Sequence, residues 1–219
     1  MELLVIRDLR LEFPTFWGPV QALDGVNLSV GRGEVVGLVG ESGCGKSVTA
    51  LSVLGLIPPA ARKTVTGSIR FARRDLVRLT PRQLEKIRGN RIGMIFQEPM
   101  TSLNPTIRVG AQIAEVLRVH QGLRGRAAWA RAVELLADMR VPDPERVALQ
   151  YPHQLSGGMR QRVMIAMALS CGPDLLIADE PTTALDVTVQ AQVLRLLWEK
   201  VGRLGTAVLF VTHDLGVVA

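Results

Sequence analysis

The sequence predicts an α/β fold built around a mostly parallel β-sheet, and three observations support this prediction. Short apolar stretches, typical of buried strands, alternate with longer stretches whose apolar residues recur at helical spacing. A glycine-rich segment lies between one such strand and the helix that follows it. Two further apolar strands end directly in charged residues, which places polar groups at the sheet edge where ligands bind.

The first half of the chain is predicted to be mainly strands. Residues 1–30 alternate apolar and polar positions in short pieces, which indicates strands and turns. Residues 34–39 form a short apolar run that we expect to be a buried strand. Residues 47–57 follow at helical spacing and end before a Pro-Pro pair. Further strands are expected at 67–71 and 92–96.

The second half is predicted to be mainly helical. Residues 99–147 have a helical pattern, which is clearest at 109–119 and 127–139. The remaining expected elements are a helix at 157–170, a strand at 175–178, a helix at 187–201 and a strand at 207–211.

Length and composition exclude several classes of protein. The 219 residues are 47% hydrophobic and 21% charged, which is globular composition and argues against disorder. The longest uncharged apolar run, 163–171, falls well short of the ~18 residues that a membrane span needs. The start lacks the basic and apolar regions of a secretory signal. Cys44 and Cys171 form neither a disulfide framework nor a zinc pattern, so we expect a reducing, cytoplasmic setting.

Positive charge is concentrated in one stretch. The chain has 26 Lys and Arg against 20 Asp and Glu, and ten of these cations lie in residues 62–91, with Asp75 and Glu85 as the acids there. Three interpretations remain open: a solvated basic face, a surface that faces anionic lipid, or a nucleic-acid patch. Phe71 is the only aromatic residue in the stretch, which argues against binding to single-stranded nucleic acid.

The glycine-rich segment GESGCGKS, residues 40–47, fits the phosphate-binding pattern G-x-x-x-x-G-K-[ST]. Its glycines let backbone N–H groups point at phosphate oxygens, and the next helix directs its positive end at the same anion. Lys46 would reach the β- and γ-phosphates, and the Ser47 hydroxyl would bind Mg²⁺. A plain glycine turn is the alternative, but the flanking strand and helix argue against it. The predicted nucleotide-binding residues here are Gly40, Ser42, Gly43, Cys44, Gly45, Lys46 and Ser47.

A pair of carboxylates follows the apolar strand at 175–178. Asp179 stands where a carboxylate can hold Mg²⁺ through water. Glu180 points elsewhere and can polarise the attacking water as a general base. An Asp-Glu pair after a strand is usually a solvated turn, but the phosphate-binding loop makes the catalytic interpretation the stronger one.

A second glycine-containing motif is the segment LSGGMRQR, residues 155–162. Ser156 would cap a helix that Gly157 and Gly158 open, which gives another anion-binding helix end. A simple helix cap is the alternative. Two phosphate-binding helix ends in one chain suggest a nucleotide shared between two copies.

These motifs, followed by His213 near the end, come in an order that resembles the nucleotide-binding subunit of ATP-binding cassette (ABC) transporters. The resemblance covers nearly the whole chain and implies ATP and Mg²⁺ as cofactors. It also implies one ABC ATPase domain, 1–219, with a P-loop NTPase (RecA-like) core and an N-terminal antiparallel β subdomain in 1–97 and 172–219. A helical subdomain that carries the signature motif would be inserted at 98–171.

The resemblance also assigns roles. Ser156 and Gly158 of one subunit would contact the γ-phosphate bound to the other subunit. Gln97 matches the Q-loop, which senses Mg²⁺ and water and couples to the membrane partner, and Ala184-Leu185-Asp186 matches the D-loop at the dimer interface. His213 matches the switch histidine that hydrogen-bonds the γ-phosphate. A lone histidine at a strand end is more often structural, so this role rests on the resemblance.

Adenine needs a flat partner, which members of this family place upstream of the phosphate-binding loop. Trp17 lies 23 residues before Gly40 and is our candidate. Phe13 and Phe16 are alternatives, and packing within a loop is the competing interpretation of Trp17.

Three segments, 97–105, 151–162 and 179–186, resemble the oligopeptide and dipeptide importer branch, which also includes nickel importers. This implies two transmembrane permease subunits, a second ABC ATPase subunit (a heterodimer in preference to a homodimer) and, indirectly, an extracytoplasmic solute-binding protein, with no nucleic acid. The implied location is peripheral, on the cytoplasmic face of the inner membrane. Specificity would lie in the permeases and the binding protein.

One departure and two rival interpretations complete the predictions. The chain stops six residues after His213, so we expect a C-terminal end that is truncated relative to the family. An ABC-type ATPase that acts on nucleic acid or ribosomes would suit the basic stretch. However, the 110 residues between Lys46 and Ser156 leave no room for a long coiled coil. A catalytically dead partner subunit is disfavoured because every motif residue is present.

Overall fold

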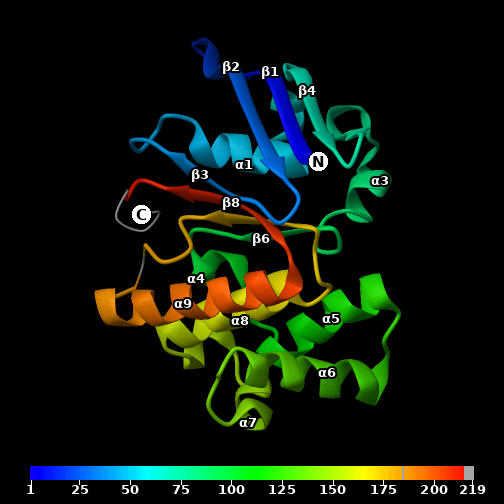
Figure 1. The fold of residues 1–219 in the computed structure, drawn as a ribbon, viewed down its shortest axis with the longest axis vertical. Coiled ribbons are helices and arrows are strands. Elements are labelled where there is room, and N and C mark those ends of the chain that lie inside the picture. The colour runs from blue at the N-terminus through cyan, green and yellow to red at the C-terminus, as the bar shows by residue number, and fades with distance from the viewer. Residues whose placement is uncertain (184, 215–219) are drawn as a thin grey trace.

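The computed structural model describes residues 1–183 and 185–214, so Ala184 of the predicted D-loop lies outside the described residues. Two four-stranded sheets organise the chain (Figure 1). One is antiparallel, in the order β2-β1-β4-β5, and the other is parallel, in the order β3-β8-β7-β6. The predicted α/β fold with a parallel core sheet is confirmed, and the antiparallel sheet is built from the N-terminal part of the chain.

The antiparallel sheet starts with a long hairpin. The prediction of strands and turns over 1–30 is confirmed, and β1 (Glu2–Thr15) and β2 (Gly18–Gly31) each run for 14 residues, longer than the short alternating pieces of the sequence. Register shifts between the two strands interrupt the alternation of apolar and polar residues. The sequence pattern is therefore broken at positions where both strands continue. β4 (Thr66–Phe71) pairs with β1, and the short β5 (Arg74–Asp75) forms the sheet edge.

The parallel sheet is formed by β3 (Val35–Val39), β8 (Ala207–Thr212), β7 (Leu175–Asp179) and β6 (Ile92–Ile95). Every residue of β7 and β8 is buried. The prediction of a buried strand at 34–39 is only half right. Val36 and Leu38 pack against the core, but Val35 is 51% exposed and Val39 is 37% exposed. Among the described strands, β3 lies at the edge of the sheet. The face of β3 that carries Val35 and Val39 is partly uncovered.

The helices lie in three groups along the chain. Before β6 come α1 (Lys46–Leu54), α2 (Pro59–Arg62), η1 (Leu76–Arg78) and α3 (Pro81–Glu85). Between β6 and β7 come α4 (Pro99–Ser102), α5 (Val109–Gln121), α6 (Gly125–Asp138), α7 (Pro144–Ala148), η2 (Pro152–Gln154) and α8 (Gly157–Leu169). The last is α9 (Val187–Leu204). Within the described residues, no helix combines the length and apolar character needed to cross a membrane.

The parallel sheet separates two hydrophobic cores. Along β8, Val208 and Phe210 face the core shared with α5, α6, α8 and α9, while Leu209 and Val211 face the core shared with α1 and the antiparallel sheet. Strand β7 alternates in the same way. Figure 1 shows α1 between the two sheets and the other long helices on the far side of the parallel sheet. Burial on both faces fixes which residues stand at the ends of these strands.

The turn between β4 and β5 carries backbone strain. Phe71 pairs with Arg74, so Ala72 and Arg73 alone connect the strands, and their φ angles are 46° and 68°. A two-residue hairpin turn with two positive φ angles favours Asn-Gly, because a Cβ makes this conformation costly. The chain nevertheless places a large cationic side chain there.

We predict that Arg73→Gly stabilises the protein by about 1 kcal/mol, because glycine adopts a positive φ without steric cost. The midpoint of urea unfolding should rise. Arg74→Gly is the control, since Arg74 lies in an extended strand where glycine should destabilise. Equal effects of the two substitutions would contradict the strain at Arg73.

Candidate functional site

A cavity of about 330 Å³ lies where β3, β6 and β7 end. Because parallel strands direct their carboxyl ends to one edge, segments that are far apart in the sequence meet there. The residues that line it are Val20, Gln21, Ala22, Ser42, Gly43, Gly45, Lys46, Ser47, Val48, Gln97 and Glu180. The glycine-rich loop, the carboxylate pair and the glutamine after β6 are therefore brought together.

The loop between β3 and α1 wraps around the Lys46 side chain. Lys46 is 6% exposed, and its Nζ donates to the carbonyl oxygens of Gly40 and Glu41, each at 2.7 Å. Its other neighbour is Cys44 Sγ at 3.9 Å, a weak acceptor that a phosphate oxygen would readily replace. None of these partners is a carboxylate, so within the described residues Lys46 forms no ion pair that would compete with a bound anion.

Gly45 shows why this loop needs glycine. Its φ is 93°, and a Cβ there would lie 2.8 Å from Leu23 Cδ2 and 2.9 Å from the Ala22 carbonyl oxygen. The loop can approach β2 this closely only without a side chain. The same turn places Gly45 at the N-cap of α1, so the helix begins directly at Lys46 with its N–H groups at the cavity. This cradle fits a phosphate group.

A hydroxyl and a carboxylate meet beside the loop. Ser47 Oγ donates to Asp179 Oδ1 at 3.0 Å, and Asp179 is 5% exposed. Burial raises the pKa of Asp179, and the charge of Glu180 adds to the rise, while the Ser47 hydrogen bond and Lys46 oppose it. A hydroxyl and a carboxylate are oxygen ligands of the kind Mg²⁺ prefers, and a bound cation would favour the ionised carboxylate. These residues fit the predicted metal site.

Glu180 is the centre of a hydrogen-bond network. Gln97 Nε2 donates to its Oε2 at 3.1 Å, the Thr183 hydroxyl donates to the same oxygen at 3.0 Å, and His213 Nδ1 lies 3.0 Å from Oε1. Burial disfavours the ionised carboxylate, but the bonds from His213 and Thr183, together with nearby positive charge, outweigh it and lower the pKa of Glu180. The lowered pKa favours the ionised carboxylate, which is the form that can accept a proton.

The backbone also holds Glu180 in place. Its φ is 45°, a left-handed conformation that is costly for a residue with a side chain, and its N–H donates to the Val211 carbonyl at 2.9 Å. This bond anchors Glu180 to β8, and the positive φ turns the chain after β7. The carboxylate is thereby directed to the cavity while Asp179 stays against Ser47.

Sequence reasoning missed two features of this site. Thr183 is a partner of Glu180, but a threonine in a loop after a strand carries no signal by itself. The wall formed by Val20, Gln21 and Ala22 was also missed, because only the pairing of β1 with β2 brings that segment to the loop.

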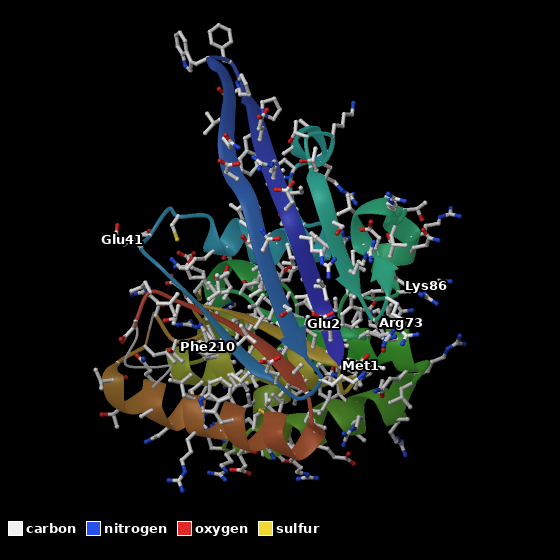
Figure 2. The ribbon with its side chains drawn as sticks, turned by 45° about the horizontal axis from the view of Figure 1, so that its top comes forward. Met1, Glu2, Glu41, Arg73, Lys86 and Phe210 are labelled. Carbon is white, nitrogen blue, oxygen red and sulfur yellow. The ribbon has the colours of Figure 1, made fainter. Side chains whose placement is uncertain are left out.

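Trp17 does not reach the cavity in this structure. It lies in the turn between β1 and β2, is 92% exposed, and contacts the ring of Phe16 with ring centroids 5.1 Å apart. Figure 2 shows the hairpin tip far from Glu41 of the loop. The residues of β2 line the cavity instead.

The Leu-Ser-Gly-Gly segment lies outside the lining of the cavity. Ser156 caps α8 as predicted, because its hydroxyl accepts a hydrogen bond from the Met159 N–H at 3.3 Å. Gly158 has a packing role that the sequence did not reveal, since a Cβ there would lie 2.7 Å from Val189 Cγ1 of α9. Asp186 is exposed and caps α9 by accepting from the Val189 N–H at 3.0 Å.

The fold and this site define a P-loop nucleotide-binding protein. The chain matches the family described as ABC transporter over residues 23–183, and it belongs to that family. Among solved structures it is similar to the dimeric post-hydrolysis state of the ATP-binding cassette MJ0796 bound to ADP and Pi. The TM-score is 0.85 at 31% identity, covering 98% of this chain and 90% of that chain.

Curated relatives have a higher sequence identity to this chain than the solved structure does. The chain is 58% identical to a probable peptide ABC transporter ATP-binding protein of Sinorhizobium fredii, covering 99% of this chain and 65% of the relative. It is 54% identical to the oligopeptide transport ATP-binding protein OppD of Bacillus subtilis, covering 99% and 61%. The chain thus spans just under two thirds of the length of these relatives.

We predict that Gly158→Ala destabilises the protein by about 1–3 kcal/mol, because the added methyl group overpacks the contact between α8 and α9. Val189→Ala in the same chain removes the clash and should restore most of the loss. Chemical denaturation of both variants measures this. If Val189→Ala brings no rescue, the packing role of Gly158 is wrong.

Proposed function

We propose that this chain binds and hydrolyses ATP and thereby powers the import of peptides through membrane permeases. The observation that carries the proposal is the meeting of Lys46, the Ser47–Asp179 pair and Glu180 around one cavity. The cavity provides a cation for phosphate, a fitting metal site and an ionised base, which phosphoryl transfer to water requires. The names of the relatives supply the peptide class.

The residues would share the work as follows. Lys46 and the N–H groups at the start of α1 bind the phosphates and stabilise charge that develops on the transferred group. Glu180 orients a water molecule and accepts its proton, and His213 and Gln97 hold the carboxylate in position. Ser47 and Asp179 would hold Mg²⁺, which neutralises phosphate charge.

A second copy or a second ATPase subunit would complete the site. Ser156, Gly157 and Gly158 lie outside the lining of the cavity, which leaves this helix end available to a nucleotide bound to another molecule. The structural relative is dimeric, in a state bound to ADP and Pi, which supports such an arrangement. A heterodimer is our preferred form, and Trp17 is proposed to reach adenine only in the nucleotide-bound state.

An apolar hollow of about 160 Å³ gives the permease a place to dock. Phe96 lines it, and the next residue, Gln97, lines the catalytic cavity, so the two sites share a segment. Leu54 and Leu56 follow from the end of α1, and Val116 and Met167 come from α5 and α8. Docking here would place the chain on the cytoplasmic face of the membrane, with a solute-binding protein acting from the other side.

Glu180→Gln tests the catalytic proposal. The variant should bind ATP with unchanged affinity and dimerise, but lose roughly 10²–10⁴-fold in the rate of phosphate release, because the amide cannot accept a proton. Glu145→Gln is the control: Glu145 is exposed on α7 and lies outside the lining of the cavity, so its substitution should leave the rate unchanged. Normal turnover by Glu180→Gln would exclude Glu180 as the general base.

Leu56→Glu tests the docking proposal. Tagged protein expressed in its native cells and recovered from detergent-solubilised membranes should capture two multi-span permeases, and the variant should lose them while its ATPase activity remains. Leu204→Glu, at the end of α9, is the matched control, since Leu204 is also partly exposed. Recovery with nucleic acid and without permeases would favour a non-transport ATPase.

A further inference from the structure

The basic stretch 62–91 has no role in the catalytic proposal, and the fold gathers part of it with β1 into one surface. Arg7, Arg70 and Arg73 line a shallow hollow of about 310 Å³ on the antiparallel sheet. Arg70 stands directly across from Val5 on β1, and Arg73 occupies the strained turn after β4. We call these three arginines and Lys86 the cationic patch. Figure 2 shows Arg73 and Lys86 at the same edge of the molecule.

The charges of the cationic patch are not neutralised within the chain. All four side chains are exposed, and none of them forms an ion pair with a described residue. Nearby, Asp75 is already paired with Arg78 at 3.4 Å, and Arg91 is paired with Asp174 at 2.8 Å. Glu2 is the acid that lines the hollow. The surface is therefore an excess of cations held close together, which costs free energy unless an anion is bound.

We propose that the cationic patch binds the anionic phospholipid surface of the membrane, next to the docked permease. Guanidinium groups match phosphate oxygens in pairs. Met1 and Val5 add exposed or half-exposed apolar surface among the arginines, which suits a layer of headgroups above acyl chains. Phe71 is only 1% exposed, so this stretch offers no ring on which a base could stack, and nucleic acid fits less well.

The position of the patch agrees with this partner. Arg88 and Gly89, two and three residues after Lys86, line the apolar hollow that we assign to the permease. A permease bound there would bring the bilayer to this side of the molecule, so this argument rests on the proposed function. The strain at Arg73 also supports an anionic partner, because the chain keeps a cation where glycine would be more stable.

The test is sedimentation of the full chain with vesicles, without nucleotide or permease. Vesicles of phosphatidylglycerol and phosphatidylcholine should bind the protein at low salt and release it at high salt, and pure phosphatidylcholine vesicles should not bind it. Because each basic side chain near an anionic surface strengthens binding about fivefold, the triple variant R70Q/R73Q/K86Q should bind roughly a hundredfold more weakly.

A second triple variant, R126Q/R195Q/R203Q, is the control. These arginines are exposed and form no ion pair with a described residue, and they lie on α6 and α9, beyond the parallel sheet from β4. Both variants lower the formal net charge of +6 by three. The control should keep its affinity, which separates the patch from an effect of net charge.

Several outcomes would overturn the proposal: equal loss in both variants, equal binding to neutral vesicles, or no binding to anionic vesicles. Binding of a duplex oligonucleotide to the patch, without binding to anionic vesicles, would identify nucleic acid as the partner. Because the assay contains no ATP, a negative result would leave the proposed ATPase intact. Conversely, absence of ATPase activity would leave the vesicle result standing.

Discussion

Strand β7 is the constraint on which the site depends. It lies between β8 and β6, pairs with both in parallel, and all five of its residues are buried. A slip of one residue would move every side chain to the opposite core, where a side chain of the wrong size costs about 1–3 kcal/mol through misfit in a close-packed interior. The position of Asp179 against Ser47 and the turn at Glu180 are therefore fixed by packing far from the cavity.

Two segments join the catalytic cavity to the apolar hollow. Helix α1 begins with Lys46 at the cavity and ends with Leu54 at the hollow, and the adjacent residues Phe96 and Gln97 lie one in each. Because interiors are close-packed, a displacement at one end of such an element cannot be absorbed along it. Movement of Gln97 with its partner Glu180 would thus be felt where the permease is proposed to dock.

Several residues serve both the fold and the site, which explains some costly choices. Glu180 has a left-handed conformation, its N–H is bonded to Val211 of the neighbouring strand, and its carboxylate lies at the cavity. Gly158 belongs to a proposed phosphate-binding helix end, yet its lack of a side chain is already required by Val189. Arg73 is the opposite case, since the fold would prefer glycine and the proposed role at the surface would account for a cation there.

Local patterns were enough to place most elements and the catalytic motifs. A run of buried residues, as in β7 and β8, or a helix that begins after Ser156, depends on interactions between near neighbours, which the sequence records directly. The glycine-rich loop likewise carries its own chemistry. Because the carboxyl ends of parallel strands share one edge of the sheet, the meeting of Ser47, Asp179 and Glu180 could be expected.

Contacts between distant segments were decided by the tertiary structure. The long hairpin placed Trp17 at its exposed tip and brought Ala22 to the loop, because the pairing of β1 with β2 runs through register shifts that the sequence does not show. The same holds for the half-exposed β3, whose burial depends on its place in the sheet. The gathering of Arg7 with Arg70 also arose only when β1 paired with β4, since the two residues are remote in the chain.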